Sequence, residues 1–183
     1  MNFKLIANTL GGIAILALVF IYGVDSDYTE EEKPAEPNIE SPTWYLVNAD
    51  TKSFDETGRL ETQTKSSLLE HFEQKDISLV QNPHITNFNN DGSEWYITAN
   101  NGKVFPGAND IEFTHDAKVR KNTPALLIES EYFFARTDAS YLTTSKPVKI
   151  TTPESITTAI GMKAYLNDEK VKLLDNVKTT YVQ

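Results

Sequence analysis

The sequence predicts an all-β domain that follows a single membrane-spanning helix. Three observations predict it. An uncharged run of twenty residues lies near the N-terminus, apolar side chains recur at every second position from Trp44 onward, and turn-forming residues interrupt that second pattern at short intervals. The chain contains no cysteine, which excludes disulfides, Cys-ligated metals and thiol catalysis.

The run from Leu5 to Val24 lies between Lys4 and Asp25 and carries no charge. At about 1.5 Å per helical residue it spans about 30 Å, the thickness of a bilayer's hydrocarbon core. Eleven of its twenty residues are Leu, Ile, Val or Phe. Together they favour insertion by roughly 3–7 kcal/mol. A cleaved signal peptide is the alternative, but this run is longer than a usual signal and does not end in Ala-x-Ala. We therefore expect an uncleaved anchor over residues 5–24.

Charges on either side of the anchor predict its orientation. Lys4 and the α-amino group precede it and acidic residues follow, so residues 1–4 stay in the cytoplasm and the rest crosses the membrane. Residues 25–42 contain seven acidic residues, one lysine and three prolines. Such a segment cannot bury enough surface to offset its ordering entropy, and we expect a solvated tether.

Residues 43–183 are enough for one domain with a proper core. The clearest strand lies at 111–119, where Ile111, Phe113, His115, Ala117 and Val119 alternate with polar residues. The same alternation at 94–99, 156–166 and 171–181 predicts further half-buried antiparallel strands. The segment 66–75 could form a short helix, but we favour a strand.

Turn-forming residues separate these strands. Turns are predicted at residues 55–58, 89–92, 100–102, 106–110, 122–124 and 167–169. This spacing is typical of an all-β sandwich, a jelly roll or an up-and-down sheet. A closed sandwich fills the space between its layers with side chains, and an open one leaves an apolar groove there. Periodicity does not distinguish the two.

The residues for a catalytic or metal site are sparse. His71, His84 and His115 lack a second histidine at ligand spacing, and we expect His115 to be a hydrogen-bonded core residue. Glu129 and Glu131 form the only carboxylate pair considered for a two-carboxylate glycosidase, and a solvated strand face explains them better. We expect no enzymatic activity and no cofactor. The net charge of −9 argues against nucleic acid as a partner.

Several short strings, in their order along the chain and together with the anchor, resemble the LptC family, the bitopic component of the lipopolysaccharide transport machinery of Gram-negative bacteria. The strings are Gly58 to Leu60, Asn82-Pro83 with Ile85 and Phe88, Trp95 to Ala99 with Gly102, Ile111 to Val119, Thr144 to Ile150, Gly161-Met162 and Val171 to Tyr181.

The resemblance implies a twisted β-jellyroll in the periplasm, built of two antiparallel sheets that open as a V around an apolar interior. It implies that the acyl chains of lipopolysaccharide occupy this interior on their way from the ATP-driven extractor LptBFG to the bridge protein LptA. The N-terminal edge of the domain is then expected to meet the extractor, and the C-terminal edge strand to pair with LptA. The anchor holds the domain at the inner membrane.

The resemblance and the apolar strand faces together nominate two sets of residues. The groove set is Ala49, Val80, Phe88, Trp95, Ile97, Phe113, Val119, Ile150 and Met162. The LptA-facing edge set is Val171, Leu173, Val177 and Tyr181. Each groove residue also fits a plain core. The alternative function is a membrane-anchored β-sandwich that binds a glycan or a protein and carries no lipid.

Overall fold

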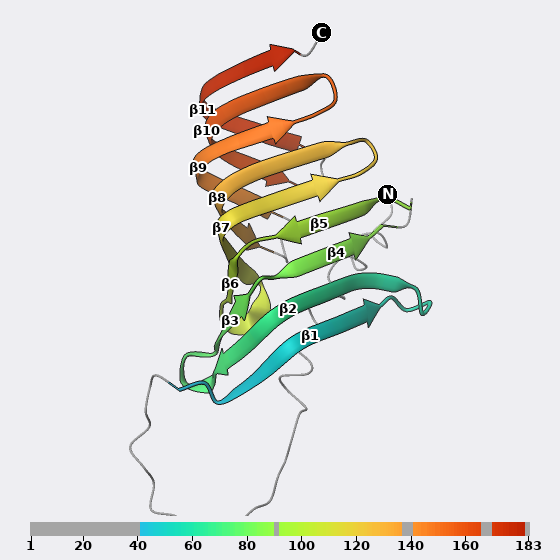
Figure 1. Cartoon of the computed structure of the whole chain (residues 1–183), viewed down its shortest axis with the longest axis vertical. Coiled ribbons are helices and arrows are strands. Elements are labelled where there is room, and N and C mark those ends of the chain that lie inside the picture. The colour runs from blue at the N-terminus through green and yellow to red at the C-terminus, as the bar shows by residue number, and fades with distance from the viewer. Residues whose placement is uncertain (1–40, 90–91, 137–140, 166–169, 182–183) are drawn as a thin grey trace, which may run out of the picture.

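The computed structural model describes residues 41–89, 92–136, 141–165 and 170–181, which form antiparallel strands and two short 3-10 helices (Figure 1). The elements are β1 Trp44–Phe54, β2 Leu60–Phe72, η1 Glu73–Lys75, β3 Ile77–Gln81, β4 His84–Phe88, β5 Glu94–Thr98, β6 Asn101–Val104, η2 Pro106–Ala108, β7 Asp110–Lys121, β8 Leu126–Arg136, β9 Tyr141–Thr151, β10 Ser155–Tyr165 and β11 Lys170–Tyr181.

All eleven strands belong to one hydrogen-bonded sheet. Its order is β11-β10-β9-β8-β7-β5-β4-β2-β3-β6, with β1 beside β2 and a second pairing between β6 and β7. We expected two separate sheets, and the structure instead has two layers of one sheet. Two long strands pair with a different short strand in each layer. β2 pairs first with β4 and then with β3, and β7 pairs first with β6 and then with β5.

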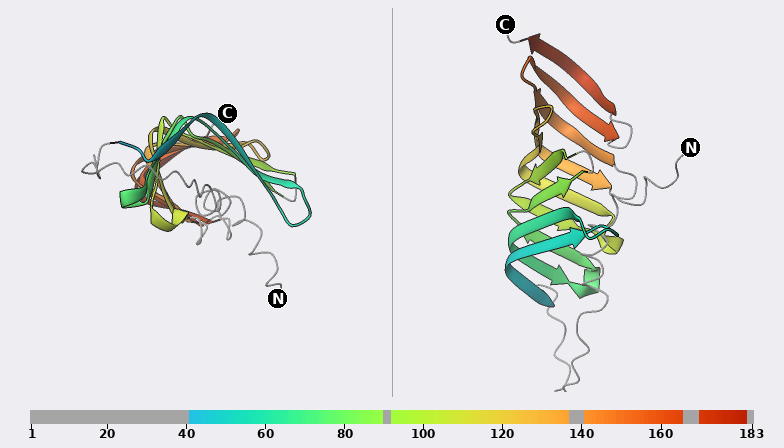
Figure 2. Two further views of the ribbon diagram at one scale, coloured as in Figure 1. Left: turned by 90° about the horizontal axis from the view of Figure 1, so that it is seen from below. Right: turned by 90° about the vertical axis from the view of Figure 1, so that its right-hand side faces the viewer.

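The sheet folds along a crease that runs across its strands. Seen end-on, it curves back on itself and leaves one side open (Figure 2). β-Bulges make the bend, because an extra residue kinks its strand without ending it. Register shifts lie between Thr114 and Ala117 in β7, between Ser130 and Phe134 in β8, and between Ile160 and Met162 in β10.

Residues in the left-handed region mark the same crease. Asn48 in β1 has φ 53°, His115 and Asp116 in β7 have φ 62° and 55°, Gly161 in β10 has φ 78°, and Asn176 in β11 has φ 49°. Gly, Asn, Asp and His are the residue types that adopt this conformation most readily. The expectation of a buried His115 is therefore wrong: the bulge turns its side chain outward, where it is exposed.

The predicted strand at 66–75 is confirmed as far as Phe72, after which η1 begins. Strands are also confirmed at 94–98, 111–119 and 171–181, and over 156–165. The turns at 55–58 and 122–124 lie between strands as predicted. Residues 106–109 of the predicted turn at 106–110 do so too, but Asp110 already begins β7, and Asn101 and Gly102 already belong to β6. The predicted turn at 167–169 lies outside the described residues, as do residues 90 and 91 of the predicted turn at 89–92.

The predicted anchor (5–24) and nearly all of the predicted tether (25–42) also lie outside the described residues. Within the part that the structure covers, no helix has the length and apolar character needed to cross a membrane.

Candidate functional site

The space between the two layers is filled around β7 to β10. Phe113, Phe133 and Met162 project into it and are 2%, 0% and 0% exposed. They share one buried cluster with Val119 and Ile128. The cluster also includes Ala99, Ile111, Ala117, Leu142, Val148, Ala159 and Ala164. This part of the interior is a close-packed core.

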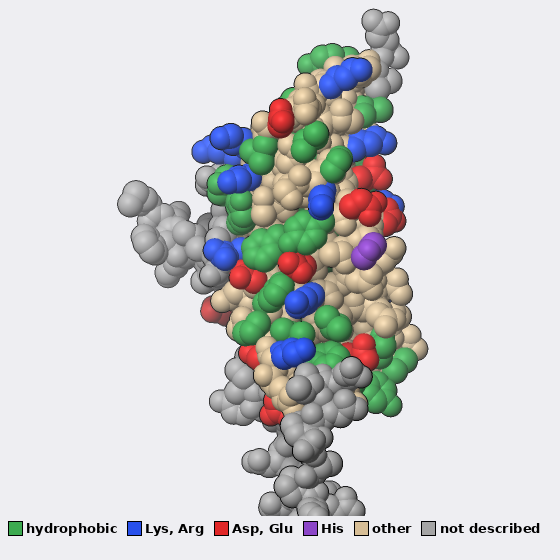
Figure 3. All heavy atoms as spheres, turned by 90° about the vertical axis from the view of Figure 1, so that its left-hand side faces the viewer, with side chains coloured by type: hydrophobic (Ala, Val, Ile, Leu, Met, Phe, Trp, Pro, Cys, Tyr) green, Lys and Arg blue, Asp and Glu red, His purple; other side chains and the backbone are tan. Residues whose placement is uncertain are grey.

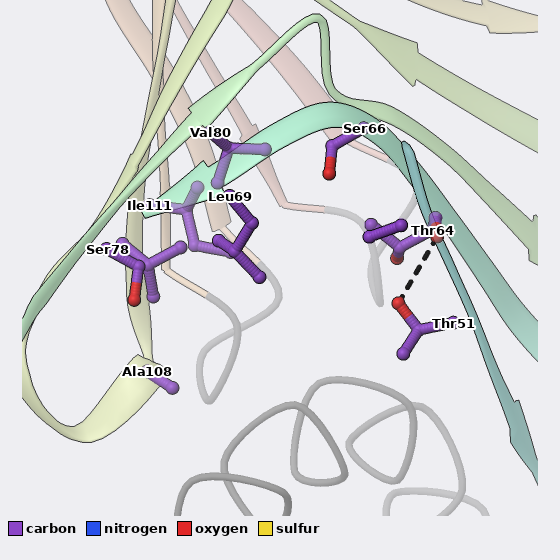
Figure 4. Close-up of a pocket in the computed structure, with 10 residues that line it drawn as sticks. Thr51, Thr64, Ser66, Leu69, Ser78, Val80, Ala108 and Ile111 are labelled. Atoms are coloured by element: carbon purple, nitrogen blue, oxygen red, sulfur yellow. Dashed lines mark hydrogen bonds between the residues drawn. The ribbon is translucent and has the colours of Figure 1, made fainter. Parts of the chain in front are cut away.

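Around β1, β2 and β3 the interior is hollow. A cavity of about 50 Å³ lies between the layers here (Figure 4). It is lined by Ala49, Thr51, Thr64, Ser66, Leu69, Ser78, Val80, Val104, Ala108 and Ile111. Its residues come from β1, β2, β3, β6, η2 and β7. Ile111 belongs to the packed core as well, so the cavity ends where the core begins.

The lining suits hydrocarbon better than an ion. None of the lining residues is charged, and their polar groups are small hydroxyls. Two of these hydroxyls already have partners inside the protein: Thr51 Oγ1 donates to the backbone oxygen of Thr64 at 3.2 Å, and Ser78 Oγ lies 3.1 Å from His71 Nδ1. A cavity without charges or strong free donors offers nothing to offset the desolvation of an anion.

No backbone hydrogen bond joins the margins of the two layers in the described chain. The backbone hydrogen bonds outside the strands close single turns, such as Asp55 to Arg59, connect residues near the crease, such as Asn82 and Asn100, or, from Thr43 to His71, prolong the β1–β2 pair. The layers can therefore move apart at the open side without loss of a ladder hydrogen bond. Opening would cost packing contacts in the core, which is the stiffer part of the interior.

The structure divides the predicted groove set into three groups. Ala49 and Val80 line the cavity. Phe113, Val119 and Met162 are buried in the core, and Trp95, Ile97 and Ile150 are half-buried against it.

Phe88 stands apart from the rest of the set. It pairs with Glu94, so it occupies the opposite face of the sheet from Trp95 and Ile97. Phe88 therefore does not face the interior, and its place in the predicted groove set is wrong.

Sequence reasoning missed the hydroxyl side chains of the cavity. Thr62, Thr64 and Ser66 alternate along β2 at the spacing of a strand face, and Thr64 and Ser66 line the cavity. The alternation of hydroxyl residues is visible in the sequence, but apolar alternation, the usual sign of an inward strand face, does not mark it. A strand face of small hydroxyls reads as solvent-facing until the partner layer is known.

The C-terminal edge strand continues the interior face. β11 pairs with β10 and forms one end of the strand order. Val171 is opposite Ala164 and Leu173 is opposite Met162, both buried residues, so Val171 and Leu173 point to the inside of the fold. Val171, Val177 and Tyr181 are nevertheless 49%, 53% and 76% exposed. The apolar interior is thus open at this end.

The N-terminal edge is open as well. β1 pairs with β2 and, in the described chain, with no second strand. Tyr45, Leu46 and Val47 follow one another along it and are all exposed. Successive strand residues point to opposite faces, so both faces of this edge are apolar.

The histidines and glutamates that were considered for catalysis or metal binding do not come together in one site. His71 stacks on Trp44 with 5.0 Å between ring centroids, and His115 Nδ1 lies 3.2 Å from Thr114 Oγ1. Glu129 forms an ion pair with Lys149 at 3.6 Å. Glu131 is exposed. The histidines lie on separate strands, and within the described ranges no three metal-ligating side chains cluster.

Comparison with protein families identifies the chain. A family model described as "Lipopolysaccharide-assembly, LptC-related" matches residues 12–182. The chain belongs to this family. Membership in the LptC-related family makes it a component of lipopolysaccharide transport and confirms the resemblance seen in the sequence. The search of curated proteins found no match.

A solved structure supports the fold. LptH of Pseudomonas aeruginosa, described as the LptA homologous periplasmic component of the conserved lipopolysaccharide transport device, is similar with a TM-score of 0.53 and 8% identity. The match covers 67% of this chain and 94% of that chain. At such low identity the likeness concerns the fold alone, which is a jellyroll of the LptA type.

Proposed function

We propose that this LptC-family chain is a non-enzymatic, single-pass component of the inner membrane. Residues 5–24 anchor it with the N-terminus in the cytoplasm, and residues 25–42 tether the β-jellyroll in the periplasm. The domain takes lipopolysaccharide from LptBFG, holds its acyl chains between the two layers, and passes it to LptA. The N-terminal edge β1 faces the extractor, and the C-terminal edge β11 pairs with LptA.

One observation carries the proposal: an apolar interior that is hollow at one end and bounded at both ends by strands whose outer edges have no neighbouring strand in the described chain. Hydrocarbon leaves water for such a space without any covalent step. An edge strand with free backbone groups is suited to pairing with a strand of another chain. Neighbouring jellyrolls joined in this way would align their interiors.

The cavity of about 50 Å³ is small for an acyl chain, and the core blocks the way beyond it. Cargo therefore passes only when the layers separate at their open side. No backbone hydrogen bond joins the described margins of the two layers, which supports this motion. The energy for transport comes from the partner ATPase.

Photo-crosslinking tests the cargo claim. A photoreactive residue at Val80, which lines the cavity, is expected to be labelled by lipopolysaccharide in cells. The same residue at Leu79, the adjacent position on the opposite face of β3, serves as the matched control and is expected to stay unlabelled. Equal labelling at both positions, or labelling at Val80 only by polypeptide or sugar, would contradict lipid transport and favour the glycan- or protein-binding alternative.

A second position tests the handover. A photoreactive residue at Tyr181, on the inner face of β11, is expected to crosslink to LptA. Thr180, on the opposite face of the same strand, is the control and should crosslink less. A Tyr181 position that gives no LptA adduct in cells with normal lipopolysaccharide export would contradict the assignment of this edge.

A further inference from the structure

The outer face of β11 carries lysines. Lys172 is opposite Lys163, whose strand neighbours Met162 and Ala164 are buried, so both lysines point outward. Lys178 is opposite Thr158, which precedes the buried Ala159 and therefore also faces outward. Lys172 and Lys178 thus lie on the outer face, one on each side of the bend at Asn176.

These lysines outnumber the acids on this face: Asp175, opposite the exposed Ile160, lies between Lys172 and Lys178. No ion pair in the described part of the chain includes Lys163, Lys172 or Lys178. Lysines placed directly opposite each other across two strands repel, so the pair of Lys163 and Lys172 works against the stability of the free domain. Because this lysine pair lowers the stability of the isolated domain, we infer that it serves the binding of another chain.

The other edge of the sheet differs. β1 carries one acidic and one basic residue, Asp50 and Lys52, and Asp50 lies 3.9 Å from Lys65. Its exposed residues are otherwise largely apolar. The whole chain has a net charge of −9. Elsewhere on the molecule charges of both signs are interspersed with hydrophobic side chains, as on the face in Figure 3. The β11 edge thus differs from the β1 edge in its excess of lysine: its outer face carries Lys172 and Lys178 with one acid, Asp175, between them.

We propose that the LptA strand that pairs with β11 carries acidic side chains on its outer face, close to Lys172 and Lys178. This inference rests on the proposed function, since it names the chemistry by which the β11 edge selects its partner. In strand addition, the backbone hydrogen bonds provide affinity for any strand and the side chains provide the choice. The inner face must stay apolar for the cargo, so the outer face is where charge can discriminate.

The same lysines exclude the wrong partner. Two copies of this chain that paired antiparallel through β11 would bring lysines of one copy near lysines of the other. Charged side chains on an edge strand are a known obstacle to such self-association. Attraction of an acidic strand and repulsion of a second copy therefore act together.

The test measures binding of the full-length chain in detergent to the LptA protein encoded in the same genome. The double variant Lys172→Glu/Lys178→Glu is expected to weaken binding about tenfold at about 0.05 M salt and by much less at about 0.5 M salt, where surface charges are screened. The variant Lys172→Gln/Lys178→Gln is expected to lie between it and the wild type. The control Lys52→Glu/Lys75→Glu changes net charge equally in the N-terminal third and is expected to bind like the wild type.

Each outcome is decisive. If the double reversal binds with unchanged affinity while a photoreactive Tyr181 still labels LptA, the charge inference fails and the proposed function stands. If the wild type neither binds LptA nor labels it, both fail. If the reversal lowers lipopolysaccharide retention but leaves LptA binding unchanged, the lysines serve phosphates of the cargo and the inference is overturned. A Gln variant that dimerises no more than the wild type in sedimentation refutes the exclusion of a second copy.

Discussion

The interior of the folded sheet is hollow around β1 to β3 and packed around β7 to β10, although one continuous sheet builds both parts. In the hollow part the buried side chains are mostly small hydroxyls, with Leu69 as the buried large apolar residue. In the packed part the corresponding space between the layers is filled by Phe113, Phe133 and Met162. The backbone architecture is shared, so side-chain volume decides where the layers touch and where they leave room.

This difference separates two tasks. Burial of apolar surface in the packed part stabilises the domain, because each large side chain removed from water contributes about 1.5–3 kcal/mol. The hollow part forgoes some of that stabilisation and keeps space between the layers. Shortening or lengthening a side chain should therefore change the free energy of unfolding by different amounts in the two parts. Strain on the backbone should also differ between positions that are open and positions that are crowded.

The largest expected effect is truncation in the packed part. Phe133→Ala should lower the free energy of unfolding by about 3–5 kcal/mol, because the removed ring leaves a void. Leu69→Ala should cost only about 2 kcal/mol, the low end for such a change, because it enlarges a cavity that already exists. Guanidinium unfolding of the full-length variants in detergent, followed by tryptophan fluorescence, measures both. Equal losses would remove the distinction between the two parts.

Enlarging a side chain should also cost more stability in the packed part than in the hollow part. Ala117, which is 0% exposed in the packed part, leaves no space for added atoms, and Ala117→Leu should cost about 1–3 kcal/mol. Ala49→Leu extends into the cavity and should change stability by less than about 0.5 kcal/mol. The same unfolding measurement compares them. A cost at Ala49 as large as that at Ala117 would mean that the hollow part has no spare room.

Two glycines extend the comparison to the backbone. Gly58, in the turn before β2, and Gly161, in the crease of β10, have φ 81° and 78°, so a side chain strains either position. A Cβ atom at Gly58 meets nothing within 4 Å, whereas one at Gly161 lies 2.9 Å from Leu174 Cδ1. Gly161→Ala should therefore destabilise the domain by about 1 kcal/mol more than Gly58→Ala. Adding Leu174→Ala should recover part of that excess, and no recovery would argue against the contact.

The smallest expected effect concerns the turn between β1 and β2. Asp55 Oδ1 accepts hydrogen bonds from Thr57 Oγ1 at 2.6 Å and from the backbone N–H of Arg59 at 3.0 Å, and these bonds lower the pKa of the carboxyl below its usual value. A depressed pKa stabilises the fold above the unfolded value of about 3.9, and the effect is lost as the pH falls toward the folded value. Asp55→Asn should lower the melting temperature at pH 7.

The pH dependence of that variant is the diagnostic measurement. The difference in melting temperature between wild type and Asp55→Asn should shrink as the pH falls below about 4, because the carboxyl of the unfolded wild-type chain then takes up a proton while the folded one stays ionised, which favours unfolding. Asn keeps an acceptor oxygen in the turn, so the comparison isolates the charge. A difference that stays constant down to about pH 2 would mean that the charge contributes nothing.

Alternation predicted the strands because it is local. The run from Ile111 to Val119 and the apolar residues of β11 could be assigned from neighbours two positions away, and the structure confirms both strands. Ala49 and Val80, nominated through the family resemblance, do line the cavity. Phe88 was placed on the wrong face because only its pairing with Glu94 shows which side of the sheet it occupies.

The crease could not be predicted in the same way. Gly161 was visible as a residue that tolerates positive φ, but His115 and Asn48 adopt that conformation only because the strand must bend there. The cavity was harder still. Its lining comes from six elements, and its volume depends on how residues separated by dozens of positions face each other across two layers.

The sequence by itself determined the all-β character of the domain, its turns and the apolar face of each strand, because these depend on side chains a few residues apart. Only the tertiary structure decided that the strands form one folded sheet, that its middle is filled and that its N-terminal third is hollow. These features depend on bulges that align across strands and on the summed volume of side chains brought together from distant positions.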